Sequence, residues 1–346
     1  MKAQVQREFG GPGVCSIEEI ADPVPGPGEV LLRVRACALN RLDLLQRAAP
    51  LVRGFALPHI AGMDVVGDVV ARHPDLPIES GPAVGARVLV DPVSTCGVCD
   101  RCTAGLAPYC DELRTVGSTR PGGFAELVVV PAASCFPVPG DMSDVGACTL
   151  PVAAMTAWHA LVRVGQVAAG ETVLINGAGS GVSLAAMQLA RAAGASVIGT
   201  AGSRDKAAKA LAAGYDQCID YRCGDVAGAV RAITAGRGVD LVIDHVGPAQ
   251  FQASVDSLAM EGRMVFCGTT TGTEVTMALT SVYWWGRSLL GAGGYQRDEF
   301  PLMLDAMAAI GAEPVVDTVY PFDQISEAQQ RMEAGDFFGK LVVTFP

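Results

Sequence analysis

The chain has 346 residues, enough for two domains with buried cores, and its 50% apolar content excludes a largely disordered protein. Its formal net charge of -11, from 25 Lys and Arg against 36 Asp and Glu, argues against nucleic acid or an anionic membrane as the main partner. The opening MKAQVQREFGGPG has no apolar run of signal-peptide length, and we expect a cytoplasmic protein without a transmembrane segment.

The first 130 residues or so are expected to be mostly β. Short alternating or apolar runs are separated there by Gly and Pro, as in β modules. The clearest predicted strands cover residues 30–34, 65–70, 87–90 and 125–130.

Four of the chain's 11 cysteines lie within DPVSTCGVCDRCTAGLAPYC. They are Cys96, Cys99, Cys102 and Cys110, with two residues between successive members of the first three and seven before the fourth. A tight turn can direct four such thiolates to one tetrahedral zinc ion, and four sulfur ligands leave no open coordination position. We therefore predict one structural zinc in a lobe of about residues 91–115.

From about residue 155 the pattern changes to alternating strands and helices, which predicts a parallel, doubly wound sheet and an α/β fold class. The expected strands cover residues 172–176, 196–200, 217–220, 239–244, 263–268 and 288–292. The expected helices cover residues 182–193, 206–213, 226–235 and 251–258. A helix over 300–310 and an apolar strand over 340–345 follow.

A glycine-rich turn joins the first of these strands to the first helix, as a dinucleotide-binding motif requires. Gly177, Gly179 and Gly181 permit a tight turn and close approach of the backbone to a pyrophosphate at the helix N-terminus. Ser183 stands where a further glycine often packs the helix on the strand.

The end of the second strand carries no acid of the kind that binds the ribose of NAD. Ser203, Arg204 and Lys206 offer a hydroxyl and two cations there, a suitable cradle for a 2′-phosphate. This favours NADPH as cofactor, with an ordinary solvated helix N-terminus as the alternative.

These features together resemble the medium-chain dehydrogenase/reductase superfamily over nearly the whole chain. Matching stretches include VPGPGEVLLRVRACALNRLD, LPHIAGMDVVGDV, GARVLVDPVSTCGVCDRC, GGFAELVVVP, TAWHAL and GKLVVTF. The resemblance implies a GroES-like, mostly β catalytic domain (1–153 and 295–346) and a Rossmann domain (154–294).

In the zinc alcohol dehydrogenases of this superfamily, a second, catalytic zinc is bound by Cys, His and a later Cys or Asp. The resemblance places Asn40, Met63 and Val152 at these positions, with Asp64 in place of a motif glutamate. The Ser/Thr and His of the proton relay correspond to Leu42 and Leu45. Alcohol oxidation would therefore lack its Lewis acid and its base.

The segment ALNRLDLLQR is similar to that of quinone oxidoreductases and enoyl reductases, although leucine replaces a tyrosine that some of them carry. The resemblance implies an NADPH-dependent reductase of a conjugated enone, an enoyl thioester or a quinone. One alternative is an NADP-dependent alcohol dehydrogenase with unusual zinc ligands such as Cys37 and Asp64. Another is a non-catalytic NADPH-binding sensor or scaffold.

Asn40 and Asp64 are the candidate catalytic residues. Asn40 could bind the acceptor oxygen or the nicotinamide carboxamide, or act only as a helix N-cap. Asp64 is either a buried acid or a salt-bridged structural carboxylate. We expect Asp43 to orient the loop rather than take part in chemistry.

The predicted cofactor-binding residues come from the glycine-rich turn, the following strand ends and positions carried over from the family. They are Asn40, Thr156, Gly179, Ser180, Gly181, Val182, Ser203, Arg204, Tyr221, Val246, Cys267, Gly268, Thr269 and Lys340.

The remaining features concern histidines and assembly. His59, His73, His159 and His245 show no shared metal-ligand spacing and are interpreted as structural. Tyr283, Trp284 and Trp285 precede an edge strand that pairs with its twin in relatives. We therefore expect a homodimer, or a dimer of dimers.

Overall fold

The computed structural model describes residues 1–346 and divides them into two compact units. Unit 1 contains Met1–Val152, Gln296–Ala308 and Glu313–Pro346. Unit 2 contains Ala153–Tyr295 and Ala309–Ala312. The main boundaries fall beside those expected from the change in sequence pattern.

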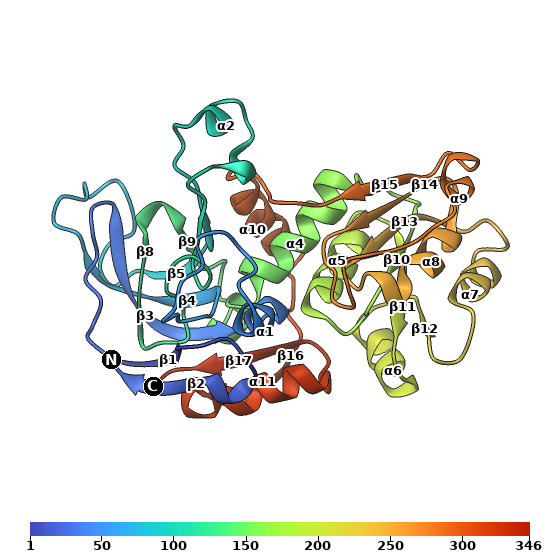
Figure 1. Cartoon of the computed structure of the whole chain (residues 1–346). Helices are drawn as coiled ribbons and strands as arrows, with labels where there is room; N and C mark the ends of the chain where they lie inside the picture. Colours follow the sequence, from blue (N-terminus) through green and yellow to red (C-terminus); the bar gives the residue numbers. More distant parts are fainter. The chain divides into compact units, whose positions relative to one another are not determined.

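Unit 1 is built on a seven-stranded sheet in the order β16-β17-β3-β4-β5-β9, with β8 paired to β3 (Figure 1). Its strands are β3 (Glu29–Ala38), β4 (Asp64–Arg72), β5 (Arg87–Val90), β8 (Leu127–Pro131), β9 (Cys135–Pro137), β16 (Val316–Pro321) and β17 (Lys340–Thr344). Strand β17 brings the end of the chain into the sheet, antiparallel to β3.

The alternation within β3 explains how this sheet buries one face. Val30, Leu32 and Val34 are almost wholly buried, while Arg33 and Arg35, which alternate with Leu32 and Val34, are exposed. Successive side chains of a strand point to opposite faces, so the valines and leucine enter the core and the arginines reach solvent.

Smaller elements complete unit 1. Strands β1 (Lys2–Gln6) and β2 (Cys15–Glu19) form a separate antiparallel pair. The helices are α1 (Arg41–Ala48), α10 (Glu299–Ala309), which ends at the border of unit 2, and α11 (Ile325–Ala334). A projecting lobe carries β6 (Val93–Ser94), α2 (Asp100–Thr103) and β7 (Arg114–Thr115) (Figure 1).

Unit 2 is a six-stranded parallel sheet in the order β12-β11-β10-β13-β14-β15. Its strands are β10 (Thr172–Ile175), β11 (Ser196–Ala201), β12 (Gln217–Asp220), β13 (Val239–Asp244), β14 (Leu258–Phe266) and β15 (Ser288–Gly291). The order reverses beside β10, which makes this a doubly wound sheet of the Rossmann type.

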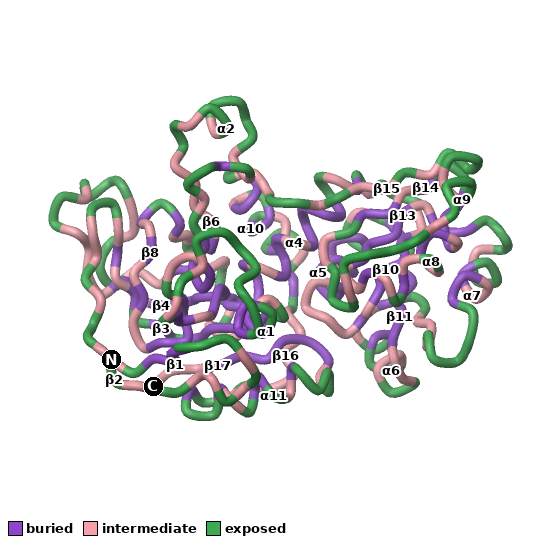
Figure 2. Tube along the Cα trace, in the orientation of Figure 1, coloured by how far each residue is buried: buried purple, intermediate pink, exposed green.

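The helices of unit 2 cover its sheet, and the central strands β10 and β13 are buried (Figure 2). These helices are α5 (Gly181–Ala192), α6 (Arg204–Ala213), α7 (Val226–Ile233), α8 (Pro248–Ser257) and the short α9 (Thr280–Tyr283). The GroES-like and Rossmann expectations are thus confirmed by the two sheets.

One helical run, Asp144–Val164, has the length and hydropathy of a membrane-spanning helix. It contains α3 (Asp144–Ala147), α4 (Met155–Trp158) and two wider π-type turns. Within its most apolar window, 72% is buried inside the protein, as in the core helix of a globular fold.

Candidate functional site

The four cysteines of the projecting lobe converge on one point. The sulfur atoms of Cys96, Cys99, Cys102 and Cys110 all lie within 4.8 Å of one another. Three pairs are separated by 3.5, 3.9 and 4.0 Å, close to the edge of about 3.8 Å of a tetrahedron with zinc–sulfur distances of about 2.3 Å. The donor set therefore fits a zinc ion that these four thiolates would hold.

Backbone N–H groups of the same lobe donate hydrogen bonds to two of these sulfurs. The N–H of Cys99 donates to the sulfur of Cys96, and that of Cys96 to the sulfur of Cys110, both at 3.4 Å. A hydrogen bond from the backbone of Cys102 lowers the pKa of the Cys99 thiol to about 6. Closed coordination by four sulfurs is typical of a structural ion.

The glycine-rich turn follows β10 and opens α5. Gly177 has a φ of 65°, a left-handed conformation that a glycine adopts without strain. Ser180 is the N-cap of α5, and its Oγ accepts a hydrogen bond from the Ser183 N–H at 3.0 Å. The free N–H groups at this helix N-terminus form the seat expected for a pyrophosphate.

All predicted cofactor residues of unit 2 except Thr156 lie at the carboxyl ends of the parallel strands or in the turns that follow them. Because the strands are parallel, these ends share one edge of the sheet. The residues are Gly179, Ser180, Gly181 and Val182 after β10, Ser203 and Arg204 after β11, Tyr221 after β12, Val246 after β13, and Cys267, Gly268 and Thr269 after β14. Thr156, in α4, is the one partly exposed residue among the buried Met155–Ala160.

The proposed 2′-phosphate cradle lies at the ends of β11 and β12. Ser203 caps α6, with its Oγ accepting from the Lys206 N–H at 3.2 Å, and Arg204 is exposed at the first helical position. The ring of Tyr221 lies against Gly202, where an added Cβ would come within 2.5 Å of the phenolic oxygen. The Ser203 hydroxyl therefore caps the helix itself, and Arg204 is an exposed cation at this edge.

In unit 1, Asn40 lies in a buried polar cluster at the start of α1. Its Nδ2 donates to Asp64 Oδ2 at 2.8 Å, and its Oδ1 accepts from Lys340 Nζ at 2.8 Å. Asp64 is fully buried, and its other oxygen, Oδ1, accepts from the Val152 N–H at 2.8 Å. Both oxygens of Asp64 are thus engaged within the protein, as a structural carboxylate requires.

Asp43 orients the same loop, as expected. Its Oδ2 accepts from the Asn40 N–H at 2.7 Å, and the Asn40 carbonyl accepts from the Asp43 N–H at 3.0 Å. Burial raises the pKa of Asp43 to about 7 against the opposing effect of the Asn40 N–H.

Lys340, one of the predicted cofactor-binding residues, lies in the same cluster. The family resemblance implies a place near the cofactor phosphates for this lysine, but its ammonium is buried and is bonded to Asp64 at 2.8 Å and to Asn40. An ammonium paired within the core is not presented as an open phosphate-binding cation. This geometry argues against the predicted phosphate contact.

The residues at the family's catalytic zinc positions do not fit zinc. Asn40 offers an amide already bonded on both sides, Met63 is a buried thioether, and Val152 has no ligand atom in its side chain. The alternative ligands Cys37 and Asp64 are both buried, and no third His, Cys, Asp or Glu gathers with them. The four-cysteine cluster is the one group of this kind in the chain.

Two features of the site were missed from sequence. Lys340 completes the Asn40–Asp64 cluster from the last strand, and His245 contacts the glycine-rich turn through Ser180 and Ser183. The departure from glycine at Ser183 was a usable signal, because an added hydroxyl needs a partner.

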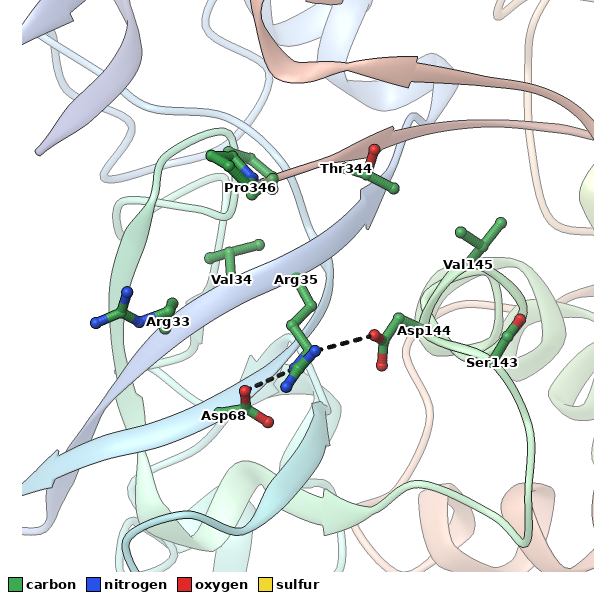
Figure 3. A pocket seen from close by; sticks show the side chains of 10 residues that line it. Arg33, Val34, Arg35, Asp68, Ser143, Asp144, Val145, Thr344 and Pro346 are labelled. Atoms are coloured by element: carbon green, nitrogen blue, oxygen red, sulfur yellow. Dashed lines mark hydrogen bonds and ion pairs between the residues drawn. The ribbon is translucent and has the colours of Figure 1, made fainter.

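A separate groove of about 430 Å³ on unit 1 contains none of the predicted site residues (Figure 3). Arg35 points between Asp68 and Asp144, at 2.6 and 3.7 Å, and these ion pairs tie β3 and β4 to the start of α3. The charge of Arg35 inside the groove is therefore already paired.

Comparison with known proteins agrees with the division of the chain into two units. Residues 26–140 match the alcohol dehydrogenase GroES-like domain family, and residues 181–309 match the zinc-binding dehydrogenase family. The chain is 30% identical over 328 residues to acryloyl-coenzyme A reductase of Sulfurisphaera tokodaii, covering 94% of this chain and 95% of the relative. It is 27% identical over 350 residues to quinone oxidoreductase of Homo sapiens, covering 99% and 97% respectively.

The solved structures similar to this chain include an NAD-dependent alcohol dehydrogenase. It has a TM-score of 0.93 and 37% sequence identity, covering 99% of both chains. With both domains matched and relatives covered almost end to end, the chain belongs to the medium-chain dehydrogenase/reductase superfamily and is an oxidoreductase.

Proposed function

We propose that this protein is an NADPH-dependent reductase that transfers hydride to a conjugated enone, an enoyl thioester or a quinone without a catalytic zinc. The observation that carries the proposal is the buried Asn40–Asp64–Lys340 cluster. Asn40 stands at a position where zinc-dependent relatives have a ligand of their catalytic ion, and its amide is already bonded to Asp64 and Lys340.

The cluster fixes the orientation of the Asn40 amide. Lys340 can only donate, so it must face Oδ1, and the ionised Asp64 can only accept, so it must face Nδ2. Asn40 Nδ2 carries a second hydrogen that Asp64 does not use. This hydrogen is available to stabilise an acceptor oxygen on which negative charge develops.

Acceptors of this kind need less activation than a simple carbonyl. NADPH, when bound, supplies the hydride, and the acceptor oxygen takes the displaced electron pair as an enolate or a hydroquinone anion. A donor hydrogen bond from Asn40 is suited to that oxygen, and protonation from water completes the reduction.

The proposed preference for NADPH rests on the residues that follow β11 in unit 2. No acid stands at the end of β11, and Arg204 is exposed beside Gly202 and Tyr221. A guanidinium can pair with a 2′-phosphate through two parallel hydrogen bonds.

A homodimer formed through β15 is also proposed. This strand is the edge of its sheet, and Tyr283, Trp284 and Trp285 nearby are 68%, 75% and 50% exposed. An open edge beside exposed aromatic side chains suits pairing with a second copy. Sedimentation equilibrium should give twice the chain mass, and a Leu290→Pro variant should give monomer; a monomeric parent protein would contradict the dimer.

Steady-state assays with purified protein test the activity. NADPH should be consumed with members of a panel of enones, enoyl thioesters and quinones, and simple alcohols with NADP should give little turnover. If the panel stays untouched while alcohols are oxidised, the protein is an alcohol dehydrogenase and the proposal is wrong.

A further inference from the structure

His245 lies directly against the glycine-rich turn of unit 2, one residue beyond β13. Its Nε2 is 2.8 Å from the Ser183 Oγ and 3.0 Å from the Ser180 Oγ. A Cβ added to Gly177 would lie 3.2 Å from the His245 ring, and one added to Gly268 would lie 2.9 Å from its carbonyl oxygen. The imidazole therefore lies against the turn, and the backbone of His245 lies against the loop after β14.

The hydrogen-bond partners of Ser183 determine which atom donates. Ser183 is fully buried, and its Oγ lies 2.8 Å from the Asn176 carbonyl oxygen, which can only accept. The single hydroxyl hydrogen of Ser183 is thus used by Asn176. The Ser183 Oγ must then accept from the His245 Nε2–H, which fixes the ring with a hydrogen on Nε2.

A polar network around Asn176 holds this arrangement in place. Asn176 Nδ2 donates to Asp244 Oδ1 at 3.1 Å and to the Ser254 Oγ at 2.7 Å. Thr200 Oγ1 donates to Asn176 Oδ1 at 3.2 Å and accepts from the Gly177 N–H at 3.1 Å. Networks whose members all have partners are rigid, so the turn is held at several points.

We propose that His245 is a positioning residue for the cofactor: through Ser183 and Ser180 it holds the glycine-rich turn in the conformation that receives the dinucleotide pyrophosphate. In the usual fingerprint a glycine occupies position 183 and packs by contact alone. Here Ser183 replaces that contact with a hydrogen-bonded link between α5, the end of β10 and the end of β13.

Ser180 is the point at which this link reaches the ligand. Its Oγ accepts from the Ser183 N–H, and it lies at the N-cap of α5, where a phosphate oxygen would meet the free backbone N–H groups. Burial lowers the pKa of His245, so the ring is neutral near pH 7 and acts by geometry rather than by charge. The pyrophosphate is common to NADPH and NADH, so His245 should serve both equally.

The inference rests on the proposed use of a nicotinamide dinucleotide, and direct titration of the protein with NADPH and with NADH tests it without any acceptor. His245→Leu should raise the dissociation constants for both dinucleotides by a similar factor, about tenfold. His245→Gln, which keeps a donor N–H, should recover most of the affinity. In turnover, His245→Leu should raise KM for the cofactor and leave kcat at saturation nearly unchanged.

Ser183→Ala provides a second route to the same link and should also weaken both dinucleotides. Combined with His245→Leu, it should add little further loss, because the two residues share one interaction. His73→Leu, in unit 1, is the matched histidine control and should bind as the parent does.

The outcomes separate this inference from the proposed function. Unchanged dinucleotide affinity in a folded His245→Leu protein with a lower melting temperature would show a purely structural role and overturn the inference. A loss confined to NADPH would also overturn it. A parent protein that binds neither dinucleotide would contradict the proposed function itself.

Discussion

The ammonium of Lys340 lies 2.8 Å from the carboxylate of Asp64, and the two side chains are only 7% and 0% exposed. Lys340 belongs to β17 and Asp64 begins β4, so this buried pair joins the last strand of the chain to the start of a central one. Asn40 bridges both charges through its amide. Stability and the orientation of the candidate catalytic group therefore depend on the same contact.

Removing one member of this pair should be strongly destabilising. Lys340→Met leaves the Asp64 charge buried without its cation and should lower the free energy of unfolding by about 3–5 kcal/mol. The double variant Lys340→Met, Asp64→Asn should recover part of that loss, because the buried charge is gone. Urea unfolding measures both, and equal stability of parent and single variant would contradict the pairing.

The amide of Asn40 can be tested without removing the helix cap. Asn40→Ser keeps a good N-cap residue but loses the Nδ2 hydrogen, and kcat should fall about a hundredfold. Dinucleotide affinity should stay close to the parent value, whereas the melting temperature should fall because the amide's hydrogen bonds to Asp64 and Lys340 are lost, so kcat is measured well below that temperature. A kcat within twofold of the parent would show that Asn40 is only the start of α1.

The raised pKa of the buried Asp43 carboxyl should make the stability of the protein depend on pH. The folded chain holds its proton up to a pKa of about 7, whereas the ordinary value is 3.8. The folded state thus binds more protons between these values, and the stability that Asp43 gives below pH 3.8 is lost as the pH rises toward 7.

Asp43→Asn removes this titration and keeps an acceptor for the Asn40 N–H. Relative to the parent, the variant should gain up to about 1.4 kcal/mol of stability per pH unit between about pH 4 and 7, measured by urea unfolding. Asp298→Asn, at an exposed position, should show no such trend. A stability difference between Asp43→Asn and parent that does not change with pH would mean that Asp43 is ionised throughout.

Arg204 should decide between the two dinucleotides. Arg204→Ala should weaken NADPH by about ten- to a hundredfold and leave NADH nearly unchanged, since only NADPH carries the 2′-phosphate. Arg163→Ala, another exposed arginine of unit 2, is the control. Equal losses for both cofactors in a fluorescence titration would rule out the assignment.

Much of the fold follows from local pattern in the sequence. Residues 87–90, 217–220 and 239–244 are strands with the predicted bounds, because apolar runs between turn residues leave little freedom in a buried sheet. Strands β1, β2 and β16 and helix α11 were not predicted. They are half-polar or short, so their apolar periodicity is weak.

The candidate site likewise has features that the sequence predicts and features that it does not. The four cysteines and the glycine-rich turn are contiguous motifs, and their geometry could be predicted from spacing alone. Lys340 and Asn40 are in contact although 300 residues separate them in the sequence, and His245 and Ser183 are in contact across 62 residues. Such contacts arise from the packing of the sheets, which no local pattern specifies.

Metal analysis of the fully active protein tests the central claim most directly, namely that the protein binds zinc in its cysteine cluster and reduces its acceptor without a catalytic ion. The ligand sets predict about one zinc per chain, lost together with the Cys96, Cys99, Cys102 and Cys110 cluster. Two zinc ions per chain, with activity following the second, would contradict the account.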